Sequence, residues 1–93
     1  MVVGLLSLEL FIADARSLKD KRMVLRAVKD RLRRFNVAVS EVEHHDLWQR
    51  AALGVVTIAG SEALAGRELQ AVIDEIERVE PGLVSRSEVE FLT

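Results

Sequence analysis

The feature that most constrains the fold is the alternation of residues 2–13, in which both faces of an extended segment are largely apolar. One face carries Leu6, Leu8, Leu10 and Ile12. The other face carries Val3, Leu5, Ser7, Glu9 and Phe11. A period of two residues indicates a strand, and a strand that is apolar on both sides is typical of the middle of a sheet. We therefore expect a central strand here.

The remaining segments complete the order strand, helix, strand, strand, helix, strand. We expect a helix over 17–34, strands over 37–44 and 51–59, a helix from residue 61 to the Pro81-Gly82 turn, and a strand over 83–92. This order is that of the ferredoxin-like βαββαβ plan, an α+β fold in which two helices cover one face of a four-stranded antiparallel sheet. Right-handed crossovers favour the sheet order 4-1-3-2. The 93 residues suffice for a single domain, 1–93.

Local signals support these boundaries. Ser17 and Ser61 can each cap the N-terminus of a helix, and Asp20 can reach back toward Ser17 as a capping box. In the second strand the alternation slips between Val39 and Val42, which predicts a bulge or a change of face.

The sheet face without helices is expected to be a partner surface. Leu5 and Phe11 would lie on it, and an uncovered apolar patch often marks an interface. The last strand would be an edge strand with Val89 and Phe91 directed inward and charged side chains outward. A homodimer through the open sheet face or the sheet edges is therefore one hypothesis.

The segment from Ser17 to Arg34 departs from its surroundings in charge. Eight basic residues stand against two acidic ones, which gives this segment a formal charge of +6 within a chain of net charge −2, so the rest of the chain sums to −8. The bases are Lys19, Lys21, Arg22, Arg26, Lys29, Arg31, Arg33 and Arg34. Such a local excess of positive charge favours an anionic partner.

Five of these bases form one stripe, because they are separated by three or four residues. They are Lys19, Arg22, Arg26, Lys29 and Arg33. On a helix they would line one face over about 20 Å, enough to contact several phosphates. The alternative is an ordinary solvated face, in which Asp30 pairs with Arg26 and Arg34 at a spacing of four residues.

The polar segment 43–50 is expected to connect two antiparallel strands. Adjacent His44 and His45 would point to opposite faces of a continuing strand, so only Glu43 with His45, or His44 with Asp46, could share a metal ion. We assign no metal ligand and no cofactor on this spacing. Acid–base chemistry by His45 and Asp46 would lack a nucleophile or a second carboxylate cluster, so we assign no catalytic residue and expect no enzyme.

Trp48 has two interpretations. It can anchor the connection by packing against the core. Alternatively, an exposed Trp48 beside His45 and Arg50 offers a stacking platform for a nucleotide base. The third strand contains no aromatic residue, so base readout in the manner of an RNA-recognition motif is not expected.

The chain contains no cysteine, no basic leader and no apolar run of the roughly 20 residues that a membrane helix needs. We therefore expect a cytoplasmic protein that has no membrane partner.

Two segments resemble the YlxP-like family of small uncharacterised bacterial proteins. They are Ser17-Leu18-Lys19-Asp20-Lys21-Arg22 and His45-Asp46-Leu47-Trp48-Gln49-Arg50-Ala51, the latter followed by Leu53-Gly54. The resemblance covers essentially the whole chain. It implies a ferredoxin-like fold, and it brings an RNA or ribosome connection by association, because family members are often encoded beside translation-initiation and ribosome-maturation factors. It implies no catalytic residues.

The sequence thus favours an accessory protein without catalytic activity that binds structured RNA or the ribosome through the basic first helix. The alternative is a protein-interaction module or homodimer with no role in nucleic-acid binding.

Overall fold

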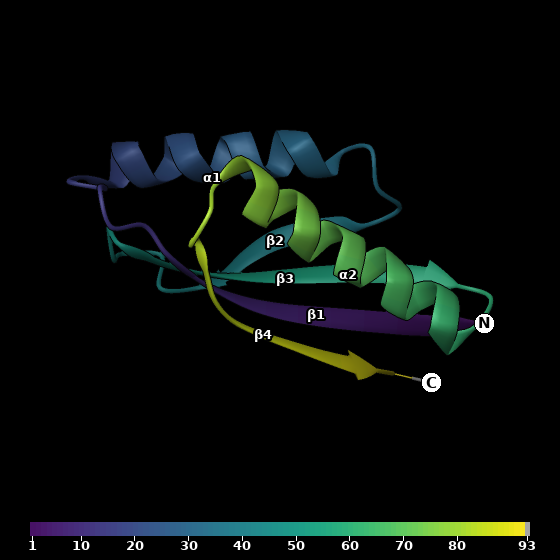
Figure 1. Ribbon diagram of the computed structural model, residues 1–93. Helices are drawn as coiled ribbons and strands as arrows, with labels where there is room; N and C mark the ends of the chain where they lie inside the picture. The colour runs from purple at the N-terminus through teal and green to yellow at the C-terminus, as the bar shows by residue number, and fades with distance from the viewer. Residues whose placement is uncertain (93) are drawn as a thin grey trace.

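The structure is a computed structural model that describes residues 1–92, and it has the element order expected from the sequence (Figure 1). The elements are β1 (Val2–Phe11), α1 (Leu18–Leu32), β2 (Ala38–Glu43), β3 (Arg50–Ala59), α2 (Glu62–Val79) and β4 (Val84–Phe91). The strands form one antiparallel sheet in the order β2-β3-β1-β4, and both helices lie on the same side of it. The prediction of a ferredoxin-like α+β fold is confirmed.

β1 is the central strand, as its two apolar faces predicted. It pairs with β3 in continuous register from Val2 opposite Ala59 to Phe11 opposite Arg50. The β1 side chains on the helix side, Leu6, Leu8 and Leu10, are each no more than 1% exposed. They form the core together with buried leucine, valine, isoleucine and alanine side chains of α1, β3 and α2.

The helix starts follow the predicted caps, with one difference. The Ser17 hydroxyl accepts a hydrogen bond from the backbone N–H of Asp20 at 3.1 Å, and the Ser61 hydroxyl accepts one from Leu64 at 3.2 Å. The Asp20 carboxylate does not close a capping box on Ser17. It accepts instead from the backbone N–H of Arg16 at 3.0 Å, which satisfies a donor one residue earlier.

α2 lies close to β1 because Gly4 has no side chain. A Cβ atom at this position would lie 3.1 Å from Leu69 Cδ1 and 3.4 Å from Ala65 Cβ. The first of these contacts is tighter than ordinary packing, so Leu69 would have to move by a few tenths of an ångström. Gly4 therefore leaves room for the Leu69 side chain of this helix against the sheet.

The two edge strands, β2 and β4, differ from the central strands in register or in the exposure of their apolar side chains. In β2 the register shifts between Glu41 and Glu43, which confirms the predicted bulge and leaves Val42 on the open face with 54% exposure. In β4, Val89 and Phe91 lie on the helix side of the sheet as expected, but they remain 45% and 37% exposed. Their partial exposure follows from the edge position, where no further strand covers them.

Lys21 is the main departure from the sequence-based picture, because it is buried and not part of a solvated face. Its side chain is 2% exposed, and Nζ donates to the carbonyl oxygens of His44 at 2.8 Å, Arg50 at 3.2 Å and His45 at 3.4 Å. Nζ also forms an ion pair with Glu41 Oε2 at 3.0 Å, and this oxygen is buried. Lys21 thus ties α1 to the connection between β2 and β3.

Within residues 1–92, none of the helices has the length and apolar character needed to cross a membrane.

We predict that Lys21→Met destabilises the protein by about 3 kcal/mol, because three carbonyl oxygens and the Glu41 carboxylate would lose the cation that they bind. Urea unfolding followed by circular dichroism measures this difference. Lys19→Met, two residues earlier on the exposed face of the same helix, should change the unfolding free energy by about 0.5 kcal/mol or less. Equal effects of the two substitutions would show that burial of Lys21 contributes nothing specific.

Candidate functional site

The basic stripe predicted on the first helix forms a surface of α1. Four of its five members border a shallow cavity of about 270 Å³ between α1 and β2. These four are Arg22, Arg26, Lys29 and Arg33. Lys19 is exposed one turn before Arg22. Asp30 and Glu41 also line this cavity, so its positive charge is partly offset.

The ion pairs differ from those that the sequence suggested. Asp30 contacts Arg33 at 3.3 Å and does not pair with Arg26 or Arg34. Within residues 1–92, four bases of the stripe have no carboxylate within ion-pair distance. They are Lys19, Arg22, Arg26 and Lys29, which we call the cation row. The predicted pairing of Asp30 with Arg26 and Arg34 is therefore wrong, whereas an ordinary solvated face stays the alternative to a ligand-binding surface.

Arg34 belongs to the seam between the two helices. It contacts the Glu75 carboxylate of α2 at 3.2 Å, and Arg78 contacts the same carboxylate at 2.8 Å. The hydrogen bond from Arg78 is the largest cause that holds the pKa of Glu75 below its ordinary value, and the charges of Arg34 and Arg31 add to it. A lowered carboxyl pKa means that this contribution to stability is present at neutral pH and is lost as the pH falls through it.

The connection between β2 and β3 is held in place from two sides. Lys21 binds its carbonyl oxygens, and the Gln49 amide donates to the carbonyls of Ala13 at 3.1 Å and Ala15 at 3.3 Å. His44 has a φ of 63°, in the left-handed region, so the chain does not continue as a strand there. The condition under which His44 and His45 would point to opposite faces, a strand that continues through both, is therefore not met.

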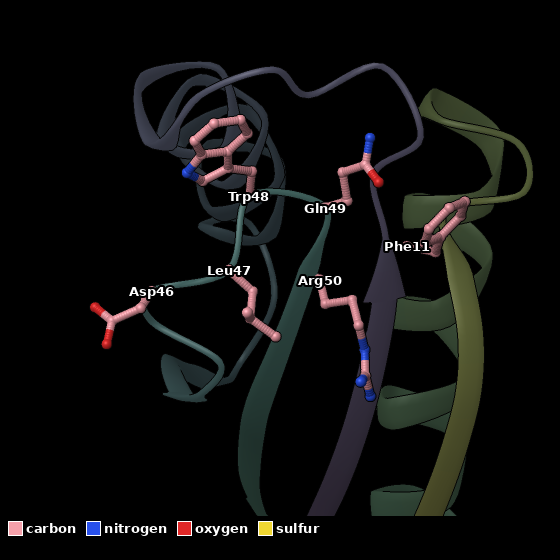
Figure 2. Close-up of a pocket in the computed structure, with 6 residues that line it drawn as sticks. All are labelled: Phe11, Asp46, Leu47, Trp48, Gln49 and Arg50. Carbon is pink, nitrogen blue, oxygen red and sulfur yellow. The ribbon is translucent and has the colours of Figure 1, made fainter.

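This connection and the end of β1 border an open groove of about 490 Å³, which we call the apolar groove (Figure 2). Its lining consists of Phe11, Asp46, Leu47, Trp48, Gln49 and Arg50. Trp48 is 52% exposed, so the expectation that it anchors the connection in the core is wrong. Phe11 and Leu47 are 49% and 44% exposed, so three large apolar side chains meet solvent at one end of the open face.

The three residues proposed for base stacking do not form one cluster. Trp48 and Arg50 line the apolar groove, where their side chains point apart (Figure 2). His45 does not line it, and its Nε2 atom lies 3.3 Å from the Glu41 carbonyl oxygen. Sequence reasoning missed Phe11 as a member of the groove. The signal was its place as the last residue of β1 on the open face, directly opposite Arg50 in the register.

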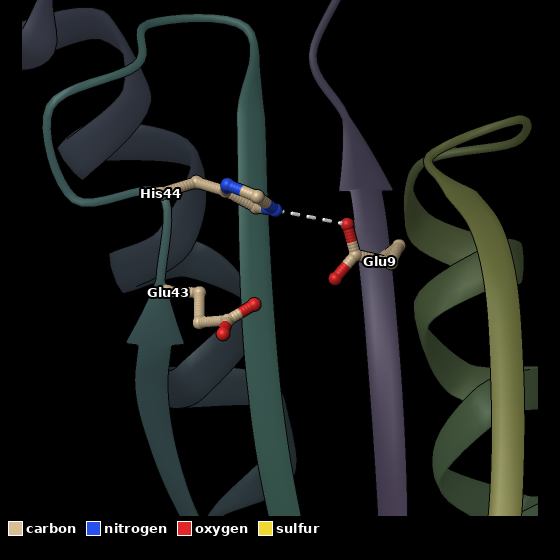
Figure 3. Close-up of side chains that lie close together, drawn as sticks. All are labelled: Glu9, Glu43 and His44. Carbon is tan, nitrogen blue, oxygen red and sulfur yellow. Dashed lines mark hydrogen bonds and ion pairs between the residues drawn. The ribbon is translucent and has the colours of Figure 1, made fainter.

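A polar cluster adjoins the groove on the open face (Figure 3). Glu9 Oε1 accepts from His44 Nε2 at 3.1 Å and from Arg50 Nη2 at 3.2 Å. One potential metal-ligating atom from each of Glu9, Glu43 and His44 lies within 4.8 Å of the other two. The structure thus groups His44 with Glu43 and Glu9, and not in either of the pairs considered from the sequence.

We predict that an aqueous quencher such as iodide reaches the Trp48 indole of the folded protein nearly as readily as that of the urea-unfolded chain. Trp48 is the only tryptophan, and the chain has no tyrosine, so its emission reports this position alone. Stern–Volmer analysis of the fluorescence makes the comparison. Strong protection in the folded protein would contradict the exposed position.

Comparison with known proteins agrees with the resemblance noted in the sequence. Residues 3–89 match a family described as "Protein of unknown function (DUF503)". The "Uncharacterized protein YlxP" of Bacillus subtilis (strain 168) is 38% identical over 73 residues, which cover 77% of this chain and 79% of that protein. Neither description names an activity or a partner. The chain therefore belongs to the DUF503 family, whose function is unknown.

Proposed function

We propose that the protein binds structured RNA, such as ribosomal RNA, through the cation row of α1 and catalyses no reaction. The observation that supports this proposal best is that Lys19, Arg22, Arg26 and Lys29 have no carboxylate partner within residues 1–92. Cations without partners can bind phosphates without first breaking an ion pair.

The shape and charge of the surface agree with backbone contact. The four side chains are spaced by three, four and three residues, so they follow one side of the helix over about 15 Å. The rest of the chain taken together is acidic, because residues outside 17–34 sum to a formal charge of −8. This asymmetry would orient a nucleic acid toward α1 and repel it elsewhere.

Base recognition has less support in this fold. β3 contains no aromatic residue, and β1 contains only Phe11. The apolar groove lies beside the N-terminal end of α1, since Lys21 joins the two, and it could accept an unpaired base next to the cation row. Stacking on Trp48 stays a prediction, as does the cytoplasmic location expected from the sequence.

We predict that the wild-type protein binds ribosomal RNA, and that the logarithm of its association constant falls linearly with the logarithm of the salt concentration. The triple variant Arg22→Gln, Arg26→Gln, Lys29→Gln should bind more weakly, and its slope should be smaller by about 2 to 3, because roughly one counterion is released for each phosphate contact. Filter binding or fluorescence anisotropy across a salt series measures both quantities.

A matched control removes the same charge elsewhere. The triple variant Arg67→Gln, Arg78→Gln, Arg86→Gln alters exposed bases of α2 and β4 and gives the same net charge. It should keep most of the affinity and the salt slope. Equal losses in both variants would mean that only net charge matters, and absence of wild-type binding at low salt would overturn the proposal.

The second candidate function is self-association through the open sheet face. Val42 of β2 and Ile58 of β3 are 54% and 55% exposed there. Beside them, Leu5 of β1 lies opposite Val56 of β3. Acidic and basic residues of β4 border this apolar area, so a second copy related by a two-fold axis could pair its charges with them.

We predict that, if this face forms a homodimer, the wild-type mass measured by sedimentation rises with concentration toward that of two chains. Ile58→Glu should keep the protein monomeric, because it would bury a carboxylate at the interface. Leu64→Glu, at a residue of α2 that is 49% exposed on the other side of the sheet, should leave the association unchanged. A wild-type mass that stays monomeric at every concentration would exclude this function.

A further inference from the structure

We propose that Glu9, Glu43 and His44 form a binding site for a divalent transition-metal ion such as Zn²⁺. The three side chains come from β1 and from the end of β2, and they converge above β3 (Figure 3). The site lies on the open face of the sheet, so it does not depend on RNA binding by the helix.

The distances are close to those of a coordination sphere. The candidate ligand atoms lie within 4.8 Å of one another. Zinc binds nitrogen and oxygen ligands at about 2.0–2.2 Å, which places neighbouring ligand atoms of a tetrahedral site roughly 3.5 Å apart. The most distant pair of ligand atoms must therefore move closer by at most about 1.3 Å, which side-chain rotation can supply. The His44 Nε2 to Glu9 Oε1 separation of 3.1 Å already meets this requirement.

The backbone explains why these three side chains meet. Ala52 of β3 pairs with Glu9 on one side and with Glu43 on the other, so both carboxylates flank a small residue and can approach each other above it. The left-handed backbone at His44 then lets the imidazole extend over β3 toward β1. A larger residue at position 52 would occupy the space in which the three side chains converge.

The chemistry of the three groups suits a borderline divalent ion. An imidazole nitrogen and two carboxylate oxygens are common zinc ligands, and three protein ligands leave one position for water or an anion. The side chains of Glu9 and His44 are 30% and 23% exposed, whereas Glu43 is exposed, so the ion would be shielded from solvent on the side of Glu9 and His44 alone. A cavity of about 440 Å³, lined in part by Glu9 and Ser7, adjoins the cluster.

Arg50 competes with a metal ion for this site. Its Nη2 atom lies 3.2 Å from Glu9 Oε1 and 3.5 Å from His44 Nε2, where a second positive charge would be repelled. The Arg50 side chain is 55% exposed and can turn into solvent when an ion binds. Metal binding thus replaces the Arg50 guanidinium on Glu9 with a metal ion. Removal of Arg50 should therefore strengthen metal binding.

The test is titration of the purified full-length chain with Zn²⁺ in competition with a chromophoric chelator. We expect one ion per chain for the wild type. Glu43→Gln and His44→Gln should each weaken binding by at least about tenfold, as expected when a ligand is lost. Arg50→Gln should tighten binding by about tenfold, because it removes a like charge a few ångströms from the ion.

His45→Gln is the matched control, since it removes the neighbouring imidazole, which contacts a backbone carbonyl outside the cluster. It should leave the zinc affinity unchanged. Circular dichroism confirms that each variant is folded before titration. Absence of stoichiometric zinc binding by the wild type, equal losses in His44→Gln and His45→Gln, or no gain in Arg50→Gln would each overturn the proposal.

Discussion

The buried ammonium of Lys21 is the interaction on which both candidate surfaces depend. Removing a charge from water costs several kcal/mol, and the cost is recovered only when the ion finds well-placed partners. Lys21 finds three carbonyl oxygens and the Glu41 carboxylate. Because these partners belong to β2 and to the connection that follows it, one side chain fixes how α1 sits against the segment that carries His44, Trp48 and Arg50.

The two faces of the sheet pack differently because their side chains differ in size. On the helix side, Gly4 admits α2 closely, and leucine side chains fill the space between the layers. On the open side, β3 presents the small residues Ala52 and Gly54, so side chains of the neighbouring strands meet above it. Glu9 and His44 can therefore meet above β3, because its side chains are small at that point.

The fold could be predicted because it depends on patterns that are local in the sequence. Alternation identified the central strand, serines identified both helix starts, and the slip near Val42 identified the bulge. The site could be predicted only in part. Helical spacing placed the stripe, but the pairing of Arg34 with Glu75 joins residues 41 positions apart, and the burial of Lys21 depends on a connection more than 20 positions away. Spacing along one helix contains no information about such partners.

The charge available to a ligand therefore differs from the charge counted in the sequence. Of the bases between residues 17 and 34, Lys21 is buried among oxygens, and Arg33 and Arg34 have carboxylate partners. The cation row and Arg31 have no such partner within residues 1–92. On the open face the situation is the reverse, because Arg50 already pairs with Glu9. Under the two proposals, an anion on the cation row would not have to break an ion pair, whereas a metal ion on the open face would first have to displace a guanidinium group. The two proposed sites therefore differ in the free energy needed to make their side chains available to a ligand.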